Sequence, residues 1–257
     1  MKQPFKLSRR KLIYGTLIGA PTAVAADALA MEPEWLVVRK LRVGDDPQLR
    51  LVHFTDVHHK GDRGWLAKVV TKINSLRPDF VCFTGDLVED SHHAPEALAL
   101  LGKLEAPVVG IPGNHDYWAQ VDFNAYREAF AKTGGRWLMD QAWEPDGKGV
   151  RFIGLTGGAD PGLDPTPGVR NILLTHYPEH VTEMGARKFD LMLAGHSHGG
   201  QVRIPFYGAL LLPWRVGKYD LGRFDTKWGP LNVSSGIGCF YLNIRFNCRP
   251  DVALIEV

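Results

Sequence analysis

Residues 52–58 read Val-His-Phe-Thr-Asp-Val-His, a short apolar run that leads directly into an aspartate and a histidine two positions apart. Four further apolar runs lead in the same way into metal-binding or small polar residues, at 81–86, 108–116, 172–176 and 191–198. Strands that alternate with helices are typical of an α/β fold, whose ligand crevice lies beyond the carboxyl ends of the strands. The sequence therefore predicts an α/β protein with Asp, His and Asn side chains gathered at one rim.

Strand and helix patterns alternate through the body of the chain. Helices are expected at Trp65–Leu76, Pro95–Leu104 and Asp122–Lys132, the last with an Asp122 cap, and a short one from Glu179. Strands are expected at Leu49–Phe54, Asp79–Phe83, Val108–Ile111, Val150–Leu155, Ile172–Leu174, Asp190–Leu193, Gln201–Ile204, Leu231–Ser234 and Val252–Val257. Because no repeat and no linker between domains is present, residues 27–257 are expected to form a single domain.

The first 26 residues have the features of a targeting segment. A basic head with paired Arg9 and Arg10 precedes a modestly apolar run from Leu12 to Val24, and small residues follow it. Residues 1–26 are therefore expected to be a twin-arginine-type signal peptide, which exports folded proteins to the periplasm or the outer face of the cytoplasmic membrane. An uncleaved membrane anchor and a buried N-terminal helix are the alternatives. The sequence has no run of about 20 apolar residues, so no conventional membrane span is expected.

The composition is that of an ordinary globular protein. Of 257 residues, 45% are hydrophobic and 23% are charged, which excludes disordered, collagen-like and disulfide-dense classes. Residues 1–25 hold five basic and no acidic side chains, and the remainder has 25 basic against 28 acidic residues. This mildly acidic body argues against nucleic-acid binding through a broad basic face. Cys82 is expected to pack as a small apolar residue, whereas Cys239 and Cys248 could form a disulfide or stay free.

Five motifs follow the apolar runs in a fixed order. They are Asp56-Val57-His58, Gly85-Asp86, Gly113-Asn114-His115-Asp116, His176 and Gly195-His196-Ser197-His198. The glycines before Asp86, Asn114 and His196 are expected to let the backbone turn sharply without a Cβ penalty. This ordered set resembles the calcineurin-like metallophosphoesterase superfamily. The Gly-His-Ser-His-Gly-Gly-Gln run, the closing segment 247–250 and the paired arginines resemble its exported YkuE/YaeI-type subgroup.

The resemblance implies a four-layer α/β/β/α sandwich that holds two divalent metal ions at the carboxyl ends of its strands. The first ion would be bound by Asp56, His58, Asp86 and His198, and the second by Asp86, Asn114, His176 and His196. Asp86 would bridge the ions because a carboxylate has two oxygens and can bind one cation with each. Nitrogen and oxygen ligands without a thiolate suit Mn, Fe, Zn or Co. Such a pair of ions would attract an anionic phosphoester and lower the pKa of a bound water.

The third motif also supplies the expected catalytic residues. His115 follows Asn114 and is expected to face the open site, where it would stabilise phosphoryl oxygens or protonate the leaving group. Asp116 is expected to hold the His115 ring and favour its charged form. Purple acid phosphatases carry a tyrosine three residues after the Gly-Asp aspartate, whereas position 89 is Glu. That subgroup is therefore disfavoured.

The chain is expected to be a dinuclear metal-dependent phosphoesterase that hydrolyses phosphodiester or pyrophosphate bonds. A nuclease, a broad-specificity phosphomonoesterase and a non-catalytic metal- or phosphate-binding protein of the envelope are the alternatives. Residues 205–215 are mostly apolar. They could form a lip for an acyl chain or the bilayer surface, with Arg203 or Arg215 near a phosphate, or a strand that buries its leucines.

The expected partners follow from the subgroup resemblance. It implies a small phosphoester or a lipid-linked pyrophosphate, such as UDP-2,3-diacylglucosamine, as the substrate. The membrane surface and the twin-arginine export machinery are further expected partners. No stable nucleic-acid partner is expected, and the protein is expected to be a monomer.

Overall fold

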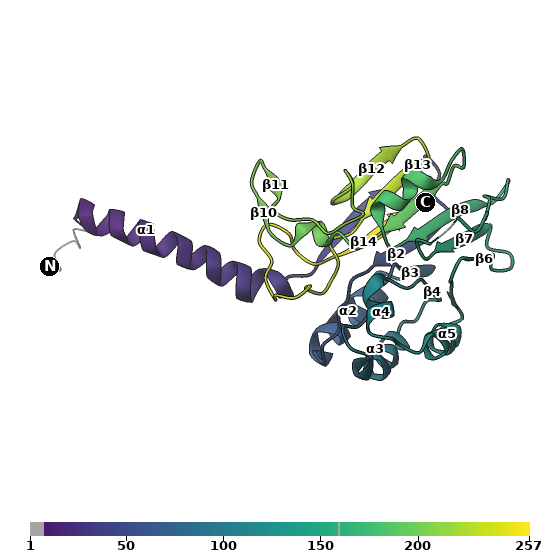
Figure 1. The fold of residues 1–257 in the computed structure, drawn as a ribbon, viewed down its shortest axis with the longest axis horizontal. Coiled ribbons are helices and arrows are strands. Elements are labelled where there is room, and N and C mark those ends of the chain that lie inside the picture. The colour runs from purple at the N-terminus through teal and green to yellow at the C-terminus, as the bar shows by residue number, and fades with distance from the viewer. Residues whose placement is uncertain (1–7, 159) are drawn as a thin grey trace.

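Two six-stranded sheets lie face to face at the centre of the computed structural model, which describes residues 8–158 and 160–257 (Figure 1). The first sheet has the order β1 (Val37–Arg42), β14 (Asp251–Glu256), β2 (Arg50–Phe54), β3 (Phe80–Phe83), β4 (Val108–Gly110) and β5 (Arg136–Trp137). The second has the order β12 (Gly222–Thr226), β13 (Gly229–Val233), β9 (Leu191–Ala194), β8 (Arg170–Thr175), β7 (Val150–Leu155) and β6 (Gln141–Trp143). Strands β10 (Arg203–Ile204) and β11 (Gly208–Ala209) form a separate antiparallel hairpin.

Parallel strands run through the middle of both sheets. Strands β2, β3, β4 and β5 are parallel neighbours in the first sheet, as are β7, β8, β9 and β13 in the second. The segments after β2, β3, β4, β8 and β9 carry the five sequence motifs. Because the carboxyl ends of parallel strands meet at one edge of a sheet, this topology brings the motifs together.

The core consists of apolar side chains that alternate along each strand. In β2, Leu51 packs between the sheets, whereas Val52 and Phe54 pack against the helices. In β8, Ile172 packs between the sheets and Leu173 faces the opposite layer. Successive side chains of a strand point to opposite faces, so an uninterrupted apolar run is buried on both sides.

Helices cover the outer face of the first sheet. They are α2 (Arg63–Ser75), α3 (Ala94–Leu101) and α5 (Phe123–Lys132), whose apolar residues share one core with β2, β3 and β4. The outer face of the second sheet is covered by the 3-10 helix η4 (Pro178–Glu183) and by loops that contribute Phe189 and Trp228. The expected four-layer sandwich is confirmed, and its fourth layer is thin. The other short helices are η1 (Asp27–Met31), η2 (Glu32–Glu34), η3 (Ser91–His93), α4 (Asn114–Trp118) and η5 (His198–Gly200).

Most expected elements are present, with ends shifted by a few residues. The Asp122 cap is confirmed, because its side chain accepts the N–H of Asn124 at 2.9 Å. Helix α3 ends at Leu101, earlier than the expected Leu104. The short helix near Glu179 is η4, a 3-10 helix. Five strands were not predicted from the sequence. Four of them, β1, β5, β6 and β12, lie at the outer edges of the two sheets, and the fifth, β11, belongs to the hairpin.

Helix α1 (Arg9–Ala26) projects away from the two sheets (Figure 1). Its described side chains are exposed, which contradicts the alternative of a buried N-terminal helix. Contact with the body begins at Ala28, which is buried and whose carbonyl accepts the N–H of Arg245 at 2.9 Å. Residues 1–7 of the expected targeting segment lie outside the described residues. No helix in the described part of the chain combines the length and the apolar character needed to cross a membrane.

The three cysteines are free thiols. Cys82 lies in the core between the sheets, as expected, and burial raises the pKa of its thiol. Cys248 is also buried, and its sulfur donates to the carbonyl of His198 at 3.3 Å. The possible disulfide between Cys239 and Cys248 is therefore not formed in this structure.

Candidate metal centre

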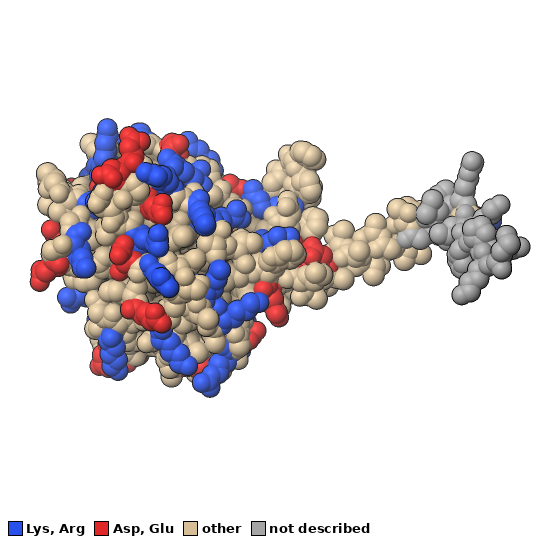
Figure 2. All heavy atoms as spheres, turned by 180° about the vertical axis from the view of Figure 1, so that it is seen from behind, with Lys and Arg blue, Asp and Glu red and all other residues tan. Residues whose placement is uncertain are grey.

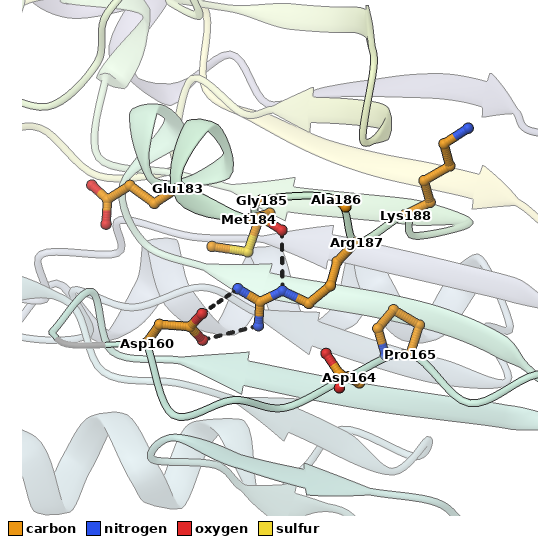
Figure 3. A pocket seen from close by; sticks show the side chains of 9 residues that line it. All are labelled: Asp160, Asp164, Pro165, Glu183, Met184, Gly185, Ala186, Arg187 and Lys188. Carbon is orange, nitrogen blue, oxygen red and sulfur yellow. Dashed lines mark hydrogen bonds and ion pairs between the residues drawn. The ribbon is translucent and has the colours of Figure 1, made fainter.

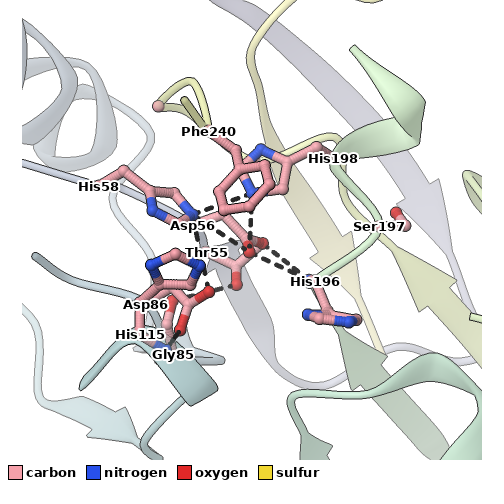
Figure 4. A network of polar contacts seen from close by, with 12 residues as sticks. Thr55, Asp56, His58, Gly85, Asp86, His115, His196, Ser197, His198 and Phe240 are labelled. Atoms are coloured by element: carbon pink, nitrogen blue, oxygen red, sulfur yellow. Dashed lines mark hydrogen bonds and ion pairs between the residues drawn. The ribbon is translucent and has the colours of Figure 1, made fainter. Parts of the chain in front are cut away.

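The seven predicted metal ligands meet at the carboxyl ends of the strands. Figure 4 shows five of them: Asp56, His58, Asp86, His196 and His198. The side chains of Asp56, His58 and His198 bring ligand atoms within 4.8 Å of one another, and so do those of Asp86, His176 and His196. The seventh residue, Asn114, joins the second group, because its Oδ1 lies 3.0 Å from Nε2 of His176. The structure thus brings together the residues that the sequence predicted, in the two expected groups.

Asp86 lies between the two groups. Its Oδ2 is 3.6 Å from Nε2 of His58 and 3.3 Å from Nε2 of His176. Its Oδ1 accepts the backbone N–H of His115 at 2.8 Å. Oδ2 is therefore the oxygen that lies within 4 Å of a histidine from each group. That Asp86 binds one cation with each of its oxygens stays a prediction.

The donor set fits two divalent ions. Nε2 of His58 and Nε2 of His198 lie 2.9 Å apart and both are buried beside the Asp56 carboxylate, whose Oδ1 is 3.3 Å from His198. Two imidazole lone pairs that face each other repel unless a proton or a metal ion lies between them. Asp56, His58, His198 and the shared Asp86 could hold one ion, and Asp86, Asn114, His176 and His196 could hold the other. When bound, such ions neutralise phosphoryl oxygens and acidify a water molecule.

Hydrogen bonds fix three of the four ligand imidazoles. Nδ1 of His58 bonds Glu89 at 2.6 Å, Nδ1 of His176 bonds the carbonyl of Thr84 at 2.7 Å, and Nε2 of His196 bonds the carbonyl of Trp214 at 2.7 Å. A ring nitrogen that donates to a carbonyl leaves the other nitrogen free as a metal ligand. For His196 that free nitrogen is Nδ1. Nδ1 of His198 is buried without a partner among the described residues.

Five of the seven predicted ligands have left-handed backbone angles. The φ angles are 51° for Asp56, 44° for His58, 60° for Asp86, 65° for His196 and 49° for His198. This conformation costs a residue other than glycine about 1 kcal/mol or more, and such strain clusters at functional sites. The turns that aim these side chains at the centre are therefore maintained at some expense in stability.

The glycines of the motifs act in two different ways. Gly85 has a φ of 101°, as a sharp turn requires. Gly113 and Gly195 do not have positive φ angles, so the expected sharp turn is not the reason for glycine at these two positions. A Cβ on Gly113 would overlap with the Asp86 carboxylate, and one on Gly195 would overlap with the side chains of the Thr55–Asp56 turn. These two positions require glycine because two chain segments approach each other closely.

Electrostatic interactions in the centre favour bound protons when no cation is present. Burial opposes charge on His58, but hydrogen bonds with Asp56 and Glu89 and the charge of Asp86 raise its pKa to about 10. Burial likewise opposes charge on His176, and Asp86 raises its pKa to about 9. Burial and the neighbouring His176 lower the pKa of His196 to about 4. The buried carboxylates therefore favour positive charge at His58 and His176 and not at His196.

His115 is oriented by Glu89, and the prediction that Asp116 holds its ring is wrong. Nδ1 of His115 lies 3.0 Å from Oε2 of Glu89, while Oε1 of the same carboxylate bonds His58. His115 and Asp116 are successive residues of helix α4, and successive helical side chains do not face each other. Because Glu89 occupies Nδ1, Nε2 is the nitrogen with which His115 can act on a substrate. Whether His115 is catalytic stays a prediction.

Asp116 instead joins two ligand-bearing loops. Its carboxylate accepts the backbone N–H groups of Asp86 at 2.9 Å, Leu87 at 3.0 Å and Gly113 at 2.9 Å. Burial and the charge of Asp86 raise the pKa of Asp116 to about 6, although the backbone donors oppose this shift. Asp116 thereby fixes the position of Asp86 relative to Asn114.

The last motif also matches a serine-hydrolase pattern, but Ser197 is not placed as a nucleophile. Residues 195–199 also satisfy the Gly-x-Ser-x-Gly pattern of serine hydrolases. Ser197 is fully buried, and its hydroxyl accepts the N–H of Gly199 at 3.1 Å. It therefore does not present an exposed nucleophile.

An apolar cavity of about 730 Å³ opens beside the metal ligands. Its lining includes the ligands Asp86, Asn114, His196 and His198 together with His115. The other lining residues are Trp118, Tyr177, Ser197, Gly200, Gln201, Val202, residues 210–214, Phe240, Tyr241, Leu242 and Ile244. Leu210, Leu211 and Leu212 are exposed, so the alternative of a strand that buries its leucines is wrong. Arg203 is paired with Asp220 at 2.8 Å, and Arg215 with Glu183 at 3.0 Å.

Another hollow, of about 460 Å³, lies between residues 160–165 and 183–188 and contains none of the predicted site residues (Figure 3). Its Arg187 is held by the carboxylate of Asp160 at 2.6 and 2.9 Å. This guanidinium is thus already neutralised.

Three groups at the centre were not predicted from the sequence. They are the Glu89 carboxylate, the Trp214 carbonyl and the ring of Phe240, which lies within 6.2 Å of the rings of His58, His115 and His198 (Figure 4). The sequence pattern distinguishes position 89 only by the absence of a tyrosine and does not indicate that Glu89 contacts the ligands. Nothing in the sequence distinguishes Phe240 from other core aromatics.

The comparisons with known proteins agree with this site. Residues 49–200 match the family described as Calcineurin-like phosphoesterase. The chain is 26% identical over 282 positions to the uncharacterized metallophosphoesterase YkuE of Bacillus subtilis, with 98% of each chain covered. It is 24% identical over 272 positions to phosphodiesterase YaeI of Escherichia coli, with 98% of this chain and 99% of YaeI covered. It is 26% identical over 313 positions to UDP-2,3-diacylglucosamine pyrophosphatase LpxG of Chlamydia trachomatis, with 94% and 95% covered.

The matched segment spans more than half of the chain and contains all seven candidate ligands. Members of this family typically bind two divalent metal ions, as the two ligand groups require, and they are hydrolases that act on phosphate esters. The likeness to YkuE and YaeI extends over nearly the whole chain at modest identity. The chain belongs to the calcineurin-like phosphoesterase family.

Proposed function

We propose that this protein hydrolyses a phosphodiester or pyrophosphate bond in an amphiphilic, lipid-linked substrate at the cell envelope. UDP-2,3-diacylglucosamine represents this class, because it joins acyl chains to a pyrophosphate. The observation that carries the proposal is the cavity of about 730 Å³, which has metal ligands at one end and apolar side chains along the rest. A charged phosphoryl group and an apolar tail could occupy it together.

The residues at the polar end suit cleavage of such a bond. The two ligand groups would place positive charge where the phosphoryl oxygens bind. His115 lines the cavity and is held through Nδ1 by Glu89 at 3.0 Å, so Nε2 could give a proton to the leaving oxygen. The aromatic rings of Trp118 and Phe240 lie 4.7 and 5.1 Å from the His115 ring and exclude water from one side of it.

The relatives support the same bond type. YaeI is named a phosphodiesterase, and LpxG is named a UDP-2,3-diacylglucosamine pyrophosphatase. A phosphodiester and a pyrophosphate both have a substituent on each side of the scissile bond. A cavity that extends away from the metal ligands has room for the second substituent, which a phosphomonoesterase does not need.

We place this activity on the outer face of the cytoplasmic membrane or in the periplasm. The proposal rests on the paired Arg9 and Arg10, on the apolar run that follows them and on the small residues at 23–25. The two-arginine change Arg9→Lys with Arg10→Lys should block export. Secretion of this variant at the wild-type level would contradict the twin-arginine route.

The activity is tested with purified protein loaded with Mn²⁺. Bis(p-nitrophenyl) phosphate, p-nitrophenyl phosphate, UDP-2,3-diacylglucosamine and single-stranded DNA are offered in parallel. We expect hydrolysis of the diester and of the UDP-lipid, and loss of both in Asp86→Ala and Asn114→Ala. Asp225→Asn, at an exposed carboxylate distant in sequence from every motif, serves as the control and should keep wild-type rates.

Each other outcome contradicts part of the proposal. Preference for the monoester would indicate a phosphomonoesterase, and digestion of DNA faster than of the small diester would indicate a nuclease. Full activity in both ligand variants would refute the site. Inactivity towards every substrate after metal loading would favour a non-catalytic binding protein.

A further inference from the structure

Six large apolar side chains in or next to the segments that line the cavity are 70% or more exposed. We call them the apolar rim: Phe206, Tyr207, Leu211, Trp214, Tyr241 and Leu242. They come from two segments, 204–214 and 236–244, and neither segment contains a charged residue. Exposed apolar residues are common singly, but a contiguous exposed group of this size marks an interaction surface.

The two segments are held together as one surface. The side-chain amide of Gln201 donates to the carbonyls of Leu242 at 3.3 Å and Ile244 at 3.1 Å, and its oxygen accepts the N–H of Phe240 at 2.6 Å. The N–H of Leu210 donates to the carbonyl of Val202 at 3.0 Å. The rim is therefore part of the folded body.

The rim has an inner and an outer part. Leu211, Trp214, Tyr241 and Leu242 line the cavity that ends at the metal ligands. Phe206 and Tyr207 do not line it; they form the turn of the β10–β11 hairpin, which projects from the body beside the base of α1 (Figure 1). In the view from behind, this projecting part carries no charged side chain at its tip (Figure 2). Phe206 is fully exposed and has a left-handed φ of 68°, so nothing within the fold explains an aromatic residue there.

A second apolar feature leaves the body on the same side. Residues 12–26 of α1 contain no charged residue, and Leu17 and Ile18 are 65% and 68% exposed. The segment that follows the helix is tied to the chain just after the rim segment 236–244, because the Glu32 carboxylate accepts the N–H groups of Asn247 at 2.7 Å and Cys248 at 2.6 Å. The β10–β11 hairpin, which carries the outer part of the rim, and the base of α1 lie on the same side of the body (Figure 1).

We propose that the apolar rim docks this protein on a lipid bilayer, with the mouth of the cavity turned towards the membrane. This inference rests on the proposed function, since the lipid-linked substrate would then enter the cavity from the bilayer. A protein partner on the rim would block the cavity mouth, whereas a bilayer both covers the rim and supplies the substrate. Tyrosine and tryptophan, which form half of the rim, are the side chains that suit a membrane–water interface.

The test uses the full chain and vesicles of phosphatidylethanolamine and phosphatidylglycerol in a flotation assay. The double variant Phe206→Asn with Tyr207→Ser removes the outer part of the rim, and asparagine suits the left-handed turn. Because these side chains lie outside the cavity and are exposed, folding and the hydrolysis of bis(p-nitrophenyl) phosphate should stay unchanged. The vesicle partition coefficient should fall by about tenfold or more, since two aromatic side chains no longer leave water.

The double variant Leu17→Ser with Ile18→Ser is the matched control, because it removes two exposed apolar side chains from α1 instead. Wild-type flotation of the rim variant with loss in the α1 variant would overturn the proposal, as would a wild-type protein that does not float. A wild-type protein that floats but hydrolyses no phosphoester would refute the proposed function and leave the docking surface standing.

Discussion

Replacing Glu89 with glutamine should impair the centre although Glu89 is not a predicted metal ligand. Its two carboxylate oxygens accept from His58 at 2.6 Å and from His115 at 3.0 Å, and these hydrogen bonds hold the pKa of Glu89 well below its usual range against the effect of burial. Glutamine has nearly the same shape, but it offers one acceptor oxygen and one NH₂ donor. One of the two imidazoles must then lose its acceptor.

The size of the effect follows from the hydrogen bond that is lost. A bond to a charged group contributes about 1.5–3 kcal/mol, which corresponds to roughly 10- to 150-fold in rate or affinity. If His115 loses its partner, kcat for bis(p-nitrophenyl) phosphate should fall by this factor at saturating Mn²⁺. If His58 loses its partner, the loss should appear in Mn²⁺ affinity, as expected for a residue that orients a ligand.

Steady-state kinetics over a Mn²⁺ series separates these two effects. Glu96→Gln is the matched control, because Glu96 makes an equivalent hydrogen bond to His59 at 2.8 Å outside the ligand groups. Glu89→Ala should reduce both kcat and Mn²⁺ affinity, since neither ring keeps its acceptor. Wild-type kcat and wild-type Mn²⁺ affinity in Glu89→Gln would refute the role assigned to this carboxylate.

Three further changes probe the centre. Gly195→Ala should lower the unfolding free energy by about 2–4 kcal/mol and weaken Mn²⁺ binding, because the new Cβ overlaps with the Thr55–Asp56 turn. Chemical denaturation measures the loss. Gly158→Ala is the control, since a Cβ there has no contact closer than 3.9 Å. Asp116→Ala should lower the unfolding free energy by about 3 kcal/mol or more, because three buried N–H groups lose their acceptor. A urea denaturation midpoint equal to that of the wild type would contradict this prediction. Since the pKa values of His58 and His176 are raised to about 10 and about 9, both rings hold protons at neutral pH and a cation must displace them. Mn²⁺ affinity should therefore rise between pH 6.5 and pH 8.5, and Mn²⁺ binding should release protons. If calorimetry finds neither the rise nor the release, His58 and His176 are not metal ligands.

The same raised pKa values have the opposite consequence for the metal-free protein. A histidine whose pKa is higher in the folded than in the unfolded state stabilises the fold below its unfolded value of about 6.5. That contribution is lost as the pH rises through 9 to 10 for His176 and His58. Metal-free and metal-bound protein should therefore differ most in stability at alkaline pH.

The elements that could be predicted from the sequence are those whose apolar side chains form the core. Strands such as β7 and β8 are buried on both faces and therefore appear in the sequence as apolar runs. The strands that were missed, β1, β5, β6, β11 and β12, are edge strands with one neighbour each. Strand β1 reads Val-Val-Arg-Lys-Leu-Arg; its three charged residues are exposed and its three apolar residues are only half-buried. Edge strands lack the periodic signal on which such predictions depend.

The ligands could be predicted because each directly follows a strand, whereas their supporting partners could not. Glu89 meets His58 and His115 only after three separate loops have folded together. The carbonyl of Trp214 that orients His196 is a backbone group, so the identity of the residue at position 214 does not indicate this role. Asp116 was misassigned because it adjoins His115 in the sequence, although helical geometry turns the two side chains apart.

Two neighbouring features of this molecule lower the stability of the fold, and folding alone does not explain either of them. Five candidate ligands, two of them buried aspartates, adopt left-handed backbone angles, and the six large apolar side chains of the rim stay in water. Four of these six line the adjoining cavity. Selection for stability would remove both, since less strained turns and polar rim residues are easily found. The first cost is offset when cations bind to the aspartates, and the second when the rim leaves water. The two features adjoin through one cavity, so the strained ligands and the exposed rim are best understood as the two ends of a single binding site.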